Sequence, residues 1–586
     1  MASKWKLGIL TAALVLVSMT TVQAGPKPGM PPQGGGSHRI SHVLLISIDG
    51  MHALDYENCV ASKTCPTLAA LGKNGVNYTR TTTSRPSDSF PGLMALVTGG
   101  TPRTVGAFYD VAYDRVLAPP ATATGNGLPA GSCIMGHING TETEYEEGVE
   151  INQHALNGGF SGYSPIDGGI KSIDPSKLER DPFNDCKPVY PWNFVRTNTI
   201  YGVIHAAGMY TAWSDKHAVY AVVSGPTGTT HPSNVDDYYS PEVNSDIVPI
   251  TGLTPAGTTF DCGTLPSGTG NDFTTNFNSI KCYDQLKVNA VVNWINGEPH
   301  LGGTPHSAPV PAIFGMNFQA VSVGQKLIQG GTLKGGYADA AGDPTVPMLG
   351  EIQFVDSAIG QMVTALKNQH LLDSTAIIIT AKHGQSPIDT NRFFPIPGSS
   401  GTNGTPPSGI VASLLPAVYS DPTNGLGLAE DDISQIWLAN ADETVKAVNE
   451  LESNGTAVGL GQIYYGASIN TLFNPPGVPD NPGPCCKLRE GGDPRTPDIV
   501  VIPNVGVVYT GSTKKQAEHG GYAWDDTNVM LLVSNPGLES TTIHSFVETT
   551  QVAPTILQLL GLDPSDLDAV KSEGTPVLPG LAFGGE

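Results

Sequence analysis

Three apolar runs along the chain have the length and composition of buried strands. They span residues 43–48, 376–380 and 529–533, and each is followed at once by polar residues. Continuous apolar runs of this length are typical of strands covered on both faces, as in a parallel sheet with helices on either side. Sites of α/β proteins form at the carboxyl ends of such strands, so the polar residues after each run are candidates for chemistry.

Apolar residues recur at spacings of three and four between residues 347 and 366, which predicts an amphipathic helix. Pro347 opens this helix and the polar stretch 368–370 ends it. A second helix is predicted over 552–560, closed by Gly561. Strands that alternate with helices predict an α/β fold, a three-layer sandwich with a mainly parallel sheet and helices on both faces.

Three long stretches interrupt this pattern, at residues 117–190, 226–281 and 395–497. All are rich in Gly, Pro, Ser, Thr and Asn, and they contain no internal repeat. We expect them to be loop-rich insertions in a single domain over 39–586, and to build the rim or a lid of its site.

The first 24 residues have the pattern of a secretory signal peptide. Lys4 and Lys6 precede the apolar run 7–16, and small or polar residues follow at 22–24. The Gly- and Pro-rich residues 25–38 predict a flexible linker. We therefore expect a secreted or periplasmic protein with no membrane anchor after cleavage, and an uncleaved signal anchor is the alternative.

The net charge disfavours one class of function, and the cysteine content supports an exported protein. With 30 Lys and Arg against 53 Asp and Glu, the formal net charge is −23, which disfavours nucleic-acid binding through a basic surface. Eight cysteines suit an oxidising compartment. Cys59 with Cys65 and Cys262 with Cys282 are near enough in sequence for local disulfides, whereas the adjacent pair at 485–486 should reach different partners.

Residues 85–100 describe a helix with its caps. Ser89 stands where an N-cap is expected, Pro91 falls in the first turn, and Gly99 and Gly100 end the helix. A hydroxyl at a helix N-terminus lies near unpaired backbone N–H groups, which attract an anion such as a phosphoryl group. From the pattern alone Ser89 is either a cap or a nucleophile at an anion site.

Residues 86–91, followed by 96–99, resemble the nucleophile segment of type I phosphodiesterases and nucleotide pyrophosphatases, in the alkaline phosphatase superfamily. Further blocks resemble this family in its own order: 48–51, 380–384, 495–501 and 519–521. The resemblance implies an alkaline-phosphatase-like fold. It also implies a hydrolase that cleaves a phosphodiester or pyrophosphate bond of a small molecule through a serine nucleophile and a phospho-enzyme intermediate.

The resemblance assigns roles to individual residues. Ser89 matches the nucleophile, and Asp49, His383 and His519 match metal ligands of a family that ordinarily uses two zinc ions. Arg85, beside the nucleophile segment, could receive a phosphate through two hydrogen bonds.

Four positions depart from the family pattern. Lys382 stands where the family has an aspartate ligand, and Val321 and Gln325 stand where it has an aspartate and a histidine. Gly92 replaces an asparagine that contacts phosphate. We keep Gly92 and Gln325, which stand where the family contacts its ligands, as candidate substrate-binding positions together with Arg85, for which pairing with a local acid is the alternative.

Three explanations of these departures remain open. In the first, one divalent metal or none is bound, and the Lys382 ammonium acts with Ser89 in place of a cation. In the second, neighbouring groups rebuild a metal site; the candidates are Asp88, Asp343, Asn317 and Gln319. In the third, hydrolysis is lost and the old cleft binds a ligand or partner. We expect a divalent metal, zinc, with one ion rather than two, and a metal-free site is the alternative.

Two further points stay open at the level of sequence. Among enzymes, a phosphomonoesterase or sulfatase-like activity is the alternative, although no sulfatase block of the form Cys/Ser-x-Pro-x-Arg is present. Residues 213–217, Trp-Ser-Asp-Lys-His, allow two interpretations, the end of another strand or a surface turn with an internal salt bridge.

Overall fold

The computed structural model describes residues 40–123, 130–144, 152, 168–245, 262, 271–397, 403–414, 429–438, 440–472, 493–510 and 514–582. The predicted signal peptide and linker lie outside the described residues, as do Cys485 and Cys486.

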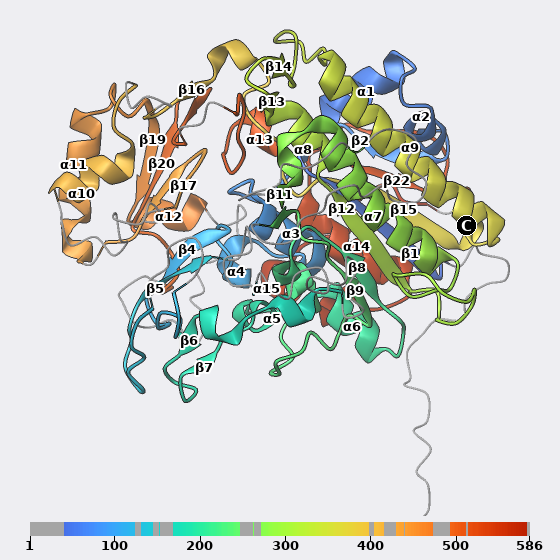
Figure 1. Ribbon diagram of the computed structural model, residues 1–586, viewed down its shortest axis with the longest axis horizontal. Coiled ribbons are helices and arrows are strands. Elements are labelled where there is room, and N and C mark those ends of the chain that lie inside the picture. Colours follow the sequence, from blue (N-terminus) through green and yellow to red (C-terminus); the bar gives the residue numbers. More distant parts are fainter. Residues whose placement is uncertain are drawn as a thin grey trace, which may run out of the picture.

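An eight-stranded sheet forms the centre of the molecule, in the order β23-β2-β22-β15-β1-β12-β8-β9 (Figure 1). Its strands are β1 His42–Ile48, β2 Gly75–Tyr78, β8 Ala212–Ser214, β9 Asp237–Tyr239, β12 Ile313–Phe318, β15 Thr375–Thr380, β22 Leu532–Ser534 and β23 Thr541–Ile543. All pair in parallel except β22, which is antiparallel to both of its neighbours. The predicted run at 529–533 therefore gives a strand, but this strand covers 532–534 and runs opposite to its neighbours in the sheet. The chain comes to β22 from the carboxyl edge of the sheet after only the short α13 (Trp524–Thr527), and a parallel strand would need a longer crossover.

Side chains of β1 alternate between two hydrophobic cores, one on each face of the sheet. Val43 and Leu45 pack in one core and Leu44 and Ile46 in the other, and all four are fully buried. Residues of α3 Ser89–Thr98, α6 Ile200–Ala206 and α14 Val552–Leu559 line the first core, and those of α1 Ala53–Ala61, α2 Pro66–Gly72, α7 Phe277–Ile295, α8 Ala320–Lys326 and α9 Val346–Asn368 line the second. This arrangement confirms the predicted three-layer α/β sandwich.

The two helices predicted from periodicity are present. α9 begins at Val346, with Thr345 as its N-cap, and α14 ends at Leu559, with Gly561 in the left-handed conformation just beyond. Each covers one face of the sheet, since residues of α14 line the first core and residues of α9 the second.

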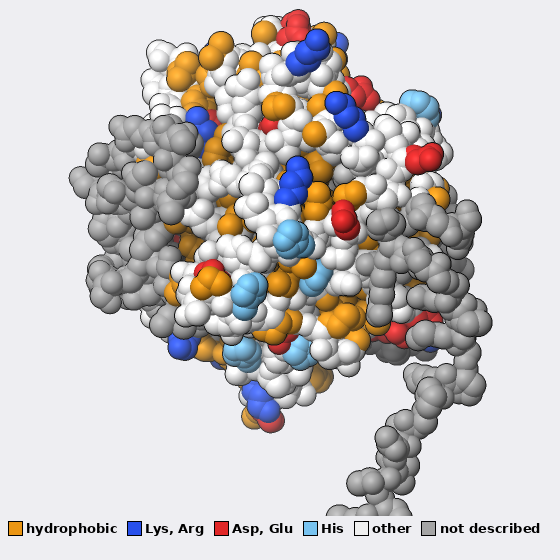
Figure 2. Space-filling model, turned by 90° about the vertical axis from the view of Figure 1, so that its right-hand side faces the viewer, with side chains coloured by type: hydrophobic (Ala, Val, Ile, Leu, Met, Phe, Trp, Pro, Cys, Tyr) orange, Lys and Arg blue, Asp and Glu red, His pale blue; other side chains and the backbone are white. Residues whose placement is uncertain are grey.

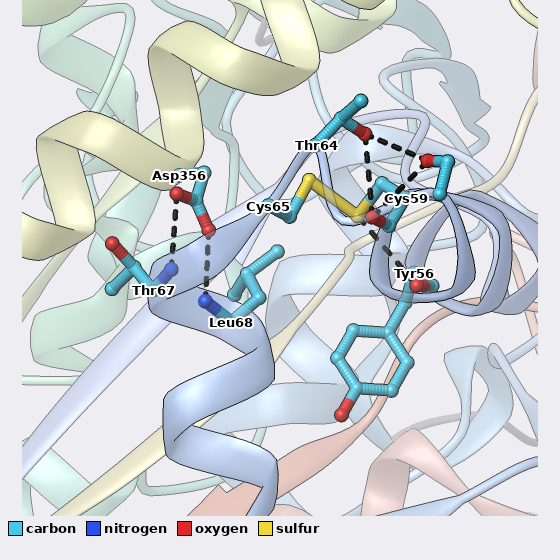
Figure 3. The surroundings of a disulfide bond; sticks show 8 residues. Tyr56, Cys59, Thr64, Cys65, Thr67, Leu68 and Asp356 are labelled. Atoms are coloured by element: carbon cyan, nitrogen blue, oxygen red, sulfur yellow. Dashed lines mark hydrogen bonds between the residues drawn. A yellow bond between two sulfur atoms is a disulfide. The ribbon is translucent and has the colours of Figure 1, made fainter.

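Disulfides tie short connections to the core. Cys59–Cys65 joins the end of α1 to the start of α2 (Figure 3), where the Asp356 carboxylate of α9 accepts hydrogen bonds from the backbone N–H groups of Thr67 and Leu68. The predicted Cys262–Cys282 bridge is also confirmed. A third bridge, Cys133–Cys186, spans 53 positions and was not expected from spacing.

A smaller antiparallel sheet lies beside the central one, on the left of Figure 1. Its strands are β17 Ala429–Glu430, β18 Ser434–Ile436, β20 Ile499–Pro503 and β19 Leu460–Tyr465, and it lies with α10 Pro407–Leu414, α11 Thr444–Ser453 and α12 Ala467–Leu472. Ile436, Val448 and Val501 belong to a separate hydrophobic core there. The stretch 395–497 supplies most of this unit, while the stretch 226–281 contributes the edge strand β9 to the central sheet.

Among the described residues, no helix combines the length and apolar character needed to cross a membrane. On the face drawn in Figure 2, Lys and Arg side chains are scattered, and some lie beside Asp or Glu side chains. The expectation that the protein has no basic surface for nucleic acid stays a prediction.

Gly315 allows β12 to approach β1, because a Cβ at this position would collide with the carbonyl oxygen of Leu45. We expect Gly315→Ala to lower the free energy of unfolding in urea by about 2 kcal/mol, the usual cost of overpacking a core. The control is Gly350→Ala in α9, where a Cβ meets no atom within 4 Å and helix propensity favours alanine. Equal stabilities of the two variants would contradict this account of the sheet.

Candidate functional site

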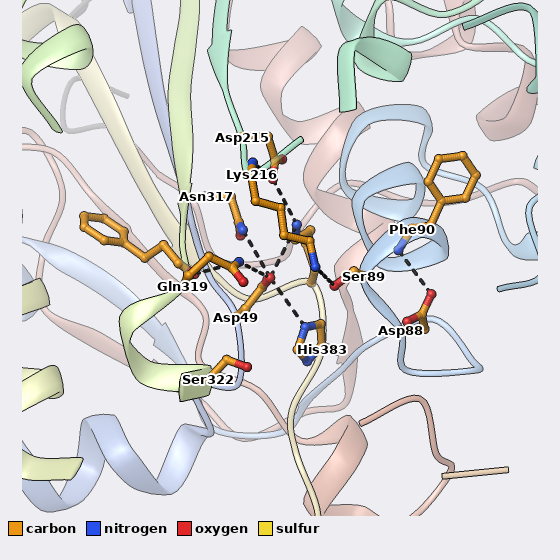
Figure 4. A network of polar contacts seen from close by, with 12 residues as sticks. Asp49, Asp88, Ser89, Phe90, Asp215, Lys216, Asn317, Gln319, Ser322 and His383 are labelled. Atoms are coloured by element: carbon orange, nitrogen blue, oxygen red, sulfur yellow. Dashed lines mark hydrogen bonds and ion pairs between the residues drawn. The ribbon is translucent and has the colours of Figure 1, made fainter. Parts of the chain in front are cut away.

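Polar side chains from four parallel strands meet at the carboxyl edge of the central sheet (Figure 4). Asp49 follows β1, Asn317 and Gln319 lie at the end of β12, Lys382 and His383 follow β15, and Asp215 and Lys216 follow β8. The N-terminus of α3, with Ser89, faces the same network. The sequence predicted this edge as the site because parallel strands end on one side of a sheet.

Asp49 is the centre of the network. Its Oδ2 accepts hydrogen bonds from Gln319 Nε2 at 2.6 Å and Asn317 Nδ2 at 3.1 Å, and lies 3.4 Å from Lys382 Nζ and 3.5 Å from His383 Nε2. Burial acts to raise the pKa of Asp49, but the charge of Lys382 and the contact with His383 outweigh it and hold that pKa well below its usual value. Asp49 is therefore ionised, and four groups gather on one of its oxygens.

Lys382 is a fully buried cation between two carboxylates. Its Nζ lies 3.4 Å from Asp49 Oδ2 and 3.3 Å from Asp215 Oδ1. Asp215 also accepts hydrogen bonds from the backbone N–H of Lys216 at 2.8 Å and from Trp213 Nε1 at 3.1 Å. The aromatic face of Tyr220 lies below the ammonium, with its centroid 4.4 Å from Nζ. The pairing compensates the cost of burying the charge.

Ser89 is the first residue of α3, and Asp88 is its N-cap. The Asp88 carboxylate accepts hydrogen bonds from the backbone N–H groups of Phe90 at 3.2 Å and Asp110 at 3.0 Å. The prediction of Ser89 as the cap is wrong by one residue. Because Asp88 caps the helix, the Ser89 hydroxyl can turn to Lys216, whose Nζ donates to Ser89 Oγ at 3.2 Å. Gly99 ends the helix in the left-handed conformation, as predicted.

His383 and His519 stack on one another, with ring centroids 4.0 Å apart. His383 Nδ1 lies 2.7 Å from the carbonyl oxygen of Gly384, to which it donates, and Nε2 faces Asp49 at 3.5 Å. His519 Nδ1 lies 3.1 Å from Glu518 Oε1, and its Nε2 has no hydrogen-bond partner among the described residues. Burial, together with His383, lowers the pKa of His519 to about 3, so its ring is neutral at physiological pH.

The three candidate substrate-binding positions lie in different surroundings. The Gln325 amide donates to the carbonyl oxygen of Gly50 at 2.7 Å and to the Tyr337 hydroxyl at 2.8 Å, inside the protein. Gly92 packs against the main chain of Lys382. Arg85 lines a cavity of about 280 Å³ that Gly521, Tyr522 and residues of the smaller sheet also line.

The described residues at the sheet edge do not fit a two-zinc centre. Lys382 occupies one ligand position, Val321 is apolar, and Gln325 bonds to Gly50. Asn317 and Gln319, considered as replacement ligands, direct N–H donors at Asp49. Among the residues described, Asp49, His383 and His519 do not form a three-ligand cluster.

One other cluster offers three possible ligands. Atoms of Asp431, Glu518 and His519 lie within 4.8 Å of one another, the single such group in the described part of the chain. Glu518 Oε2 is also paired with Lys515 Nζ at 2.5 Å. A divalent metal is consistent with the resemblance, and this cluster is where the described side chains could hold one.

Asp215, Lys216 and Tyr220 complete the network, and the sequence left their role open. Residues 213 and 214 are the last two of β8, and 215–217 follow directly. The segment is therefore the end of a strand, the first of the two interpretations, rather than a surface turn. The ion pair of Asp215 is formed with Lys382, 167 positions away, rather than within the segment. The one signal in the sequence is the Asp-Lys pair within the polar stretch that follows Trp213.

Comparison with known proteins agrees with this architecture. The family profile of type I phosphodiesterase / nucleotide pyrophosphatase matches residues 43–130 and 173–525. Murine ectonucleotide pyrophosphatase / phosphodiesterase 5 is 14% identical over 89% of this chain and 96% of that chain, with a TM-score of 0.47. An inactive form of it in complex with AMP has the same identity and coverage and a TM-score of 0.48.

The crystal structure of the alkaline phosphatase PafA is 12% identical over 90% of this chain and 96% of that chain, with a TM-score of 0.51. This likeness supports the alkaline-phosphatase-like fold. A search of the curated proteins found no match.

Asp215→Asn tests the buried network. The substitution removes one of the two carboxylates that compensate the buried charge of Lys382 and leaves Asp49 as the other, so we expect a loss of about 3 kcal/mol in the free energy of unfolding in urea. The control is Glu443→Gln, at the surface pair with Lys446, whose side chains are 40% and 56% exposed. We expect less than about 1 kcal/mol there. A small loss in both variants would show that Asp215 does not stabilise Lys382.

Proposed function

The chain belongs to the type I phosphodiesterase/nucleotide pyrophosphatase family, and from that premise we propose that it hydrolyses a phosphodiester or pyrophosphate bond of a small molecule with Ser89 as the nucleophile. One observation carries the proposal: Ser89 Oγ, at the N-terminus of α3, lies 3.2 Å from a buried ammonium group. A merely structural serine would not need a cation beside its hydroxyl.

The reaction has two halves. In the first, Ser89 Oγ attacks phosphorus, a new O–P bond forms, and the bond from phosphorus to the leaving oxygen breaks; the hydroxyl proton ends on the leaving group. In the second, water attacks the phosphoserine, the Oγ–P bond breaks, and Ser89 recovers a proton. Two displacements at phosphorus give net retention.

Charge stabilisation comes from groups that are already in place. The ten-residue α3 directs its N-terminal backbone N–H groups toward the end at which Ser89 lies. Lys382, held between Asp49 and Asp215, supplies positive charge for the phosphoryl oxygens. Preorganised groups of this kind stabilise the transition state because they need not reorient during the reaction.

Export is the second part of the proposal. The predicted signal peptide and three disulfides support a secreted or periplasmic location, since disulfides persist in oxidising compartments. The substrate is then a phosphoester outside the cytosol.

A non-catalytic binding protein is the competing function. The departures at Val321, Gln325 and Lys382 favour it, because they remove ligands that the family uses. It predicts that a phosphoester binds without turnover.

Ser89→Ala is expected to lower the rate of bis(4-nitrophenyl) phosphate hydrolysis by at least about a thousandfold, since a nucleophile has no substitute in a double-displacement reaction. Acid-quenched wild type should carry phosphate on the peptide that contains Ser89. The matched control is Ser84→Ala, whose hydroxyl donates to the carbonyl oxygen of Pro91 at 3.4 Å and which should keep most of the rate.

The outcomes separate the alternatives. Turnover of phosphomonoesters or sulfate esters alone would assign one of those activities instead. Equal rates for wild type and Ser89→Ala would exclude Ser89 as the nucleophile. Binding of a phosphoester without turnover of any of the three ester classes would support the binding protein.

A further inference from the structure

We propose that the phosphoryl site at Ser89 works without a metal ion, because the ammonium groups of Lys382 and Lys216 provide the positive charge that divalent cations provide elsewhere in the family. This inference rests on the proposed hydrolysis and names the groups that drive it. It assigns Lys216 as a catalytic residue.

The Lys382 ammonium group takes the place of a metal ion at Asp49. The Asp49 Oδ2 atom already receives two amide donors at 2.6 Å and 3.1 Å and the ammonium at 3.4 Å. An ion at this oxygen would have to displace these donors and would lie close to a buried positive charge, which repels it. The crowding concerns Oδ2, whereas Asp49 Oδ1 is buried with no hydrogen-bond partner among the described residues.

Lys216 takes the second role of a metal, which is to stabilise the nucleophile. Its Nζ donates to Ser89 Oγ at 3.2 Å, so it stabilises negative charge on that oxygen during attack and again when Oγ leaves phosphorus. No atom is exchanged between Lys216 and the substrate, and the balance of the two half-reactions is unchanged. An ammonium group in a buried site is more effective in this role than in water, since few solvent dipoles screen it.

The two lysines share two neighbours. Asp215 Oδ1 contacts both the Lys382 ammonium, at 3.3 Å, and the backbone N–H of Lys216, at 2.8 Å. The ring centroid of Tyr220 lies 4.4 Å from Lys382 Nζ and 5.6 Å from Lys216 Nζ. Asp215 thus connects the Lys382 ammonium to the main chain of Lys216, and one aromatic ring lies against both ammonium groups.

Gly92 allows the N-terminal turn of α3 to pack closely against the main chain of Lys382. A Cβ at residue 92 would collide with the carbonyl oxygen of Lys382, so the asparagine of the family pattern cannot occupy this position beside the present backbone. The glycine is therefore explained by the path of the backbone at 382.

The histidines do not restore a metal at Ser89. His383 Nε2 faces the crowded Oδ2 atom of Asp49, at 3.5 Å. His519 Nε2 lies 3.8 Å from Asp88 Oδ1, and the ring also belongs to the cluster with Asp431 and Glu518. A metal ion bound at that cluster would leave the two lysines in place, so its presence alone does not contradict the proposal.

The test compares untreated protein, protein stripped with EDTA, and stripped protein with zinc added back. Metal content is measured by mass spectrometry, and the rate of hydrolysis is measured with bis(4-nitrophenyl) phosphate. Binding of orthovanadate, a phosphoryl analogue, is measured by the shift that it causes in the melting temperature. We expect stripped wild type to keep its rate and its vanadate shift. Lys216→Met should lower the rate about a hundredfold and remove the shift.

Two further variants separate folding from function. Lys382→Met leaves two buried carboxylates unbalanced and is tested with Lys382→Met/Asp215→Asn, which removes a positive and a negative charge together. Both should lose the vanadate shift. Lys446→Met, at the surface, should match wild type in every assay.

A rate and a vanadate shift that disappear with EDTA and return with zinc would overturn the metal-free site while leaving hydrolysis through Ser89 intact. Absence of turnover would overturn the proposed function. Vanadate binding then still decides the role of the lysines. If vanadate raises the melting temperature of stripped wild type but not of Lys216→Met, the assignment of Lys216 is supported. If this rise needs zinc, or persists in Lys216→Met, the assignment is refuted.

Discussion

The buried contact between Asp49 and Lys382 is the constraint on which the site depends. It joins the ends of β1 and β15, which are neighbours in the sheet, and both side chains are almost completely buried. Charges in such a place must be paired and hydrogen bonded, and Asn317, Gln319 and Asp215 complete the pairing. These partners fix the Lys382 ammonium within a network that also reaches Ser89 through Lys216.

The parts of the fold that the sequence predicts are those with a strong repeating pattern. β1, β15 and α9 each bury a long apolar face, so their runs and spacings are unmistakable. β8 and β9 have three residues each and carry too little pattern to be recognised. The direction of β22 and the pairing of β18 with β20 depend on contacts between distant segments, which no local pattern encodes. For the same reason the local disulfides were predicted and Cys133–Cys186 was not.

In the candidate site, too, residues that follow strongly patterned strands are predictable from the sequence, and residues that follow weak strands are not. Asp49, Lys382 and His383 were predicted because they follow the strongest strands, and they meet in space. Asp215 and Lys216 follow a weak strand, and their partners Lys382 and Ser89 lie far away in the sequence. The cap of α3 was misplaced by one residue because aspartate and serine cap helices equally well. Resemblance to the family gave the prediction that Ser89 is the nucleophile, whereas the contacts of Lys382 and Lys216 depend on the paths of their side chains, which the sequence does not encode locally.

The central claim is that two ammonium groups, and no metal, surround the phosphoryl group on Ser89. The most direct measurement is a crystal structure of the vanadate complex grown with zinc present, with anomalous scattering recorded at the zinc edge. The account predicts vanadium bonded to Ser89 Oγ, the Lys216 and Lys382 ammonium groups on its oxygens, and no zinc peak between Asp49 and His383. A zinc peak at that position, with Lys382 displaced from Asp49, would contradict it.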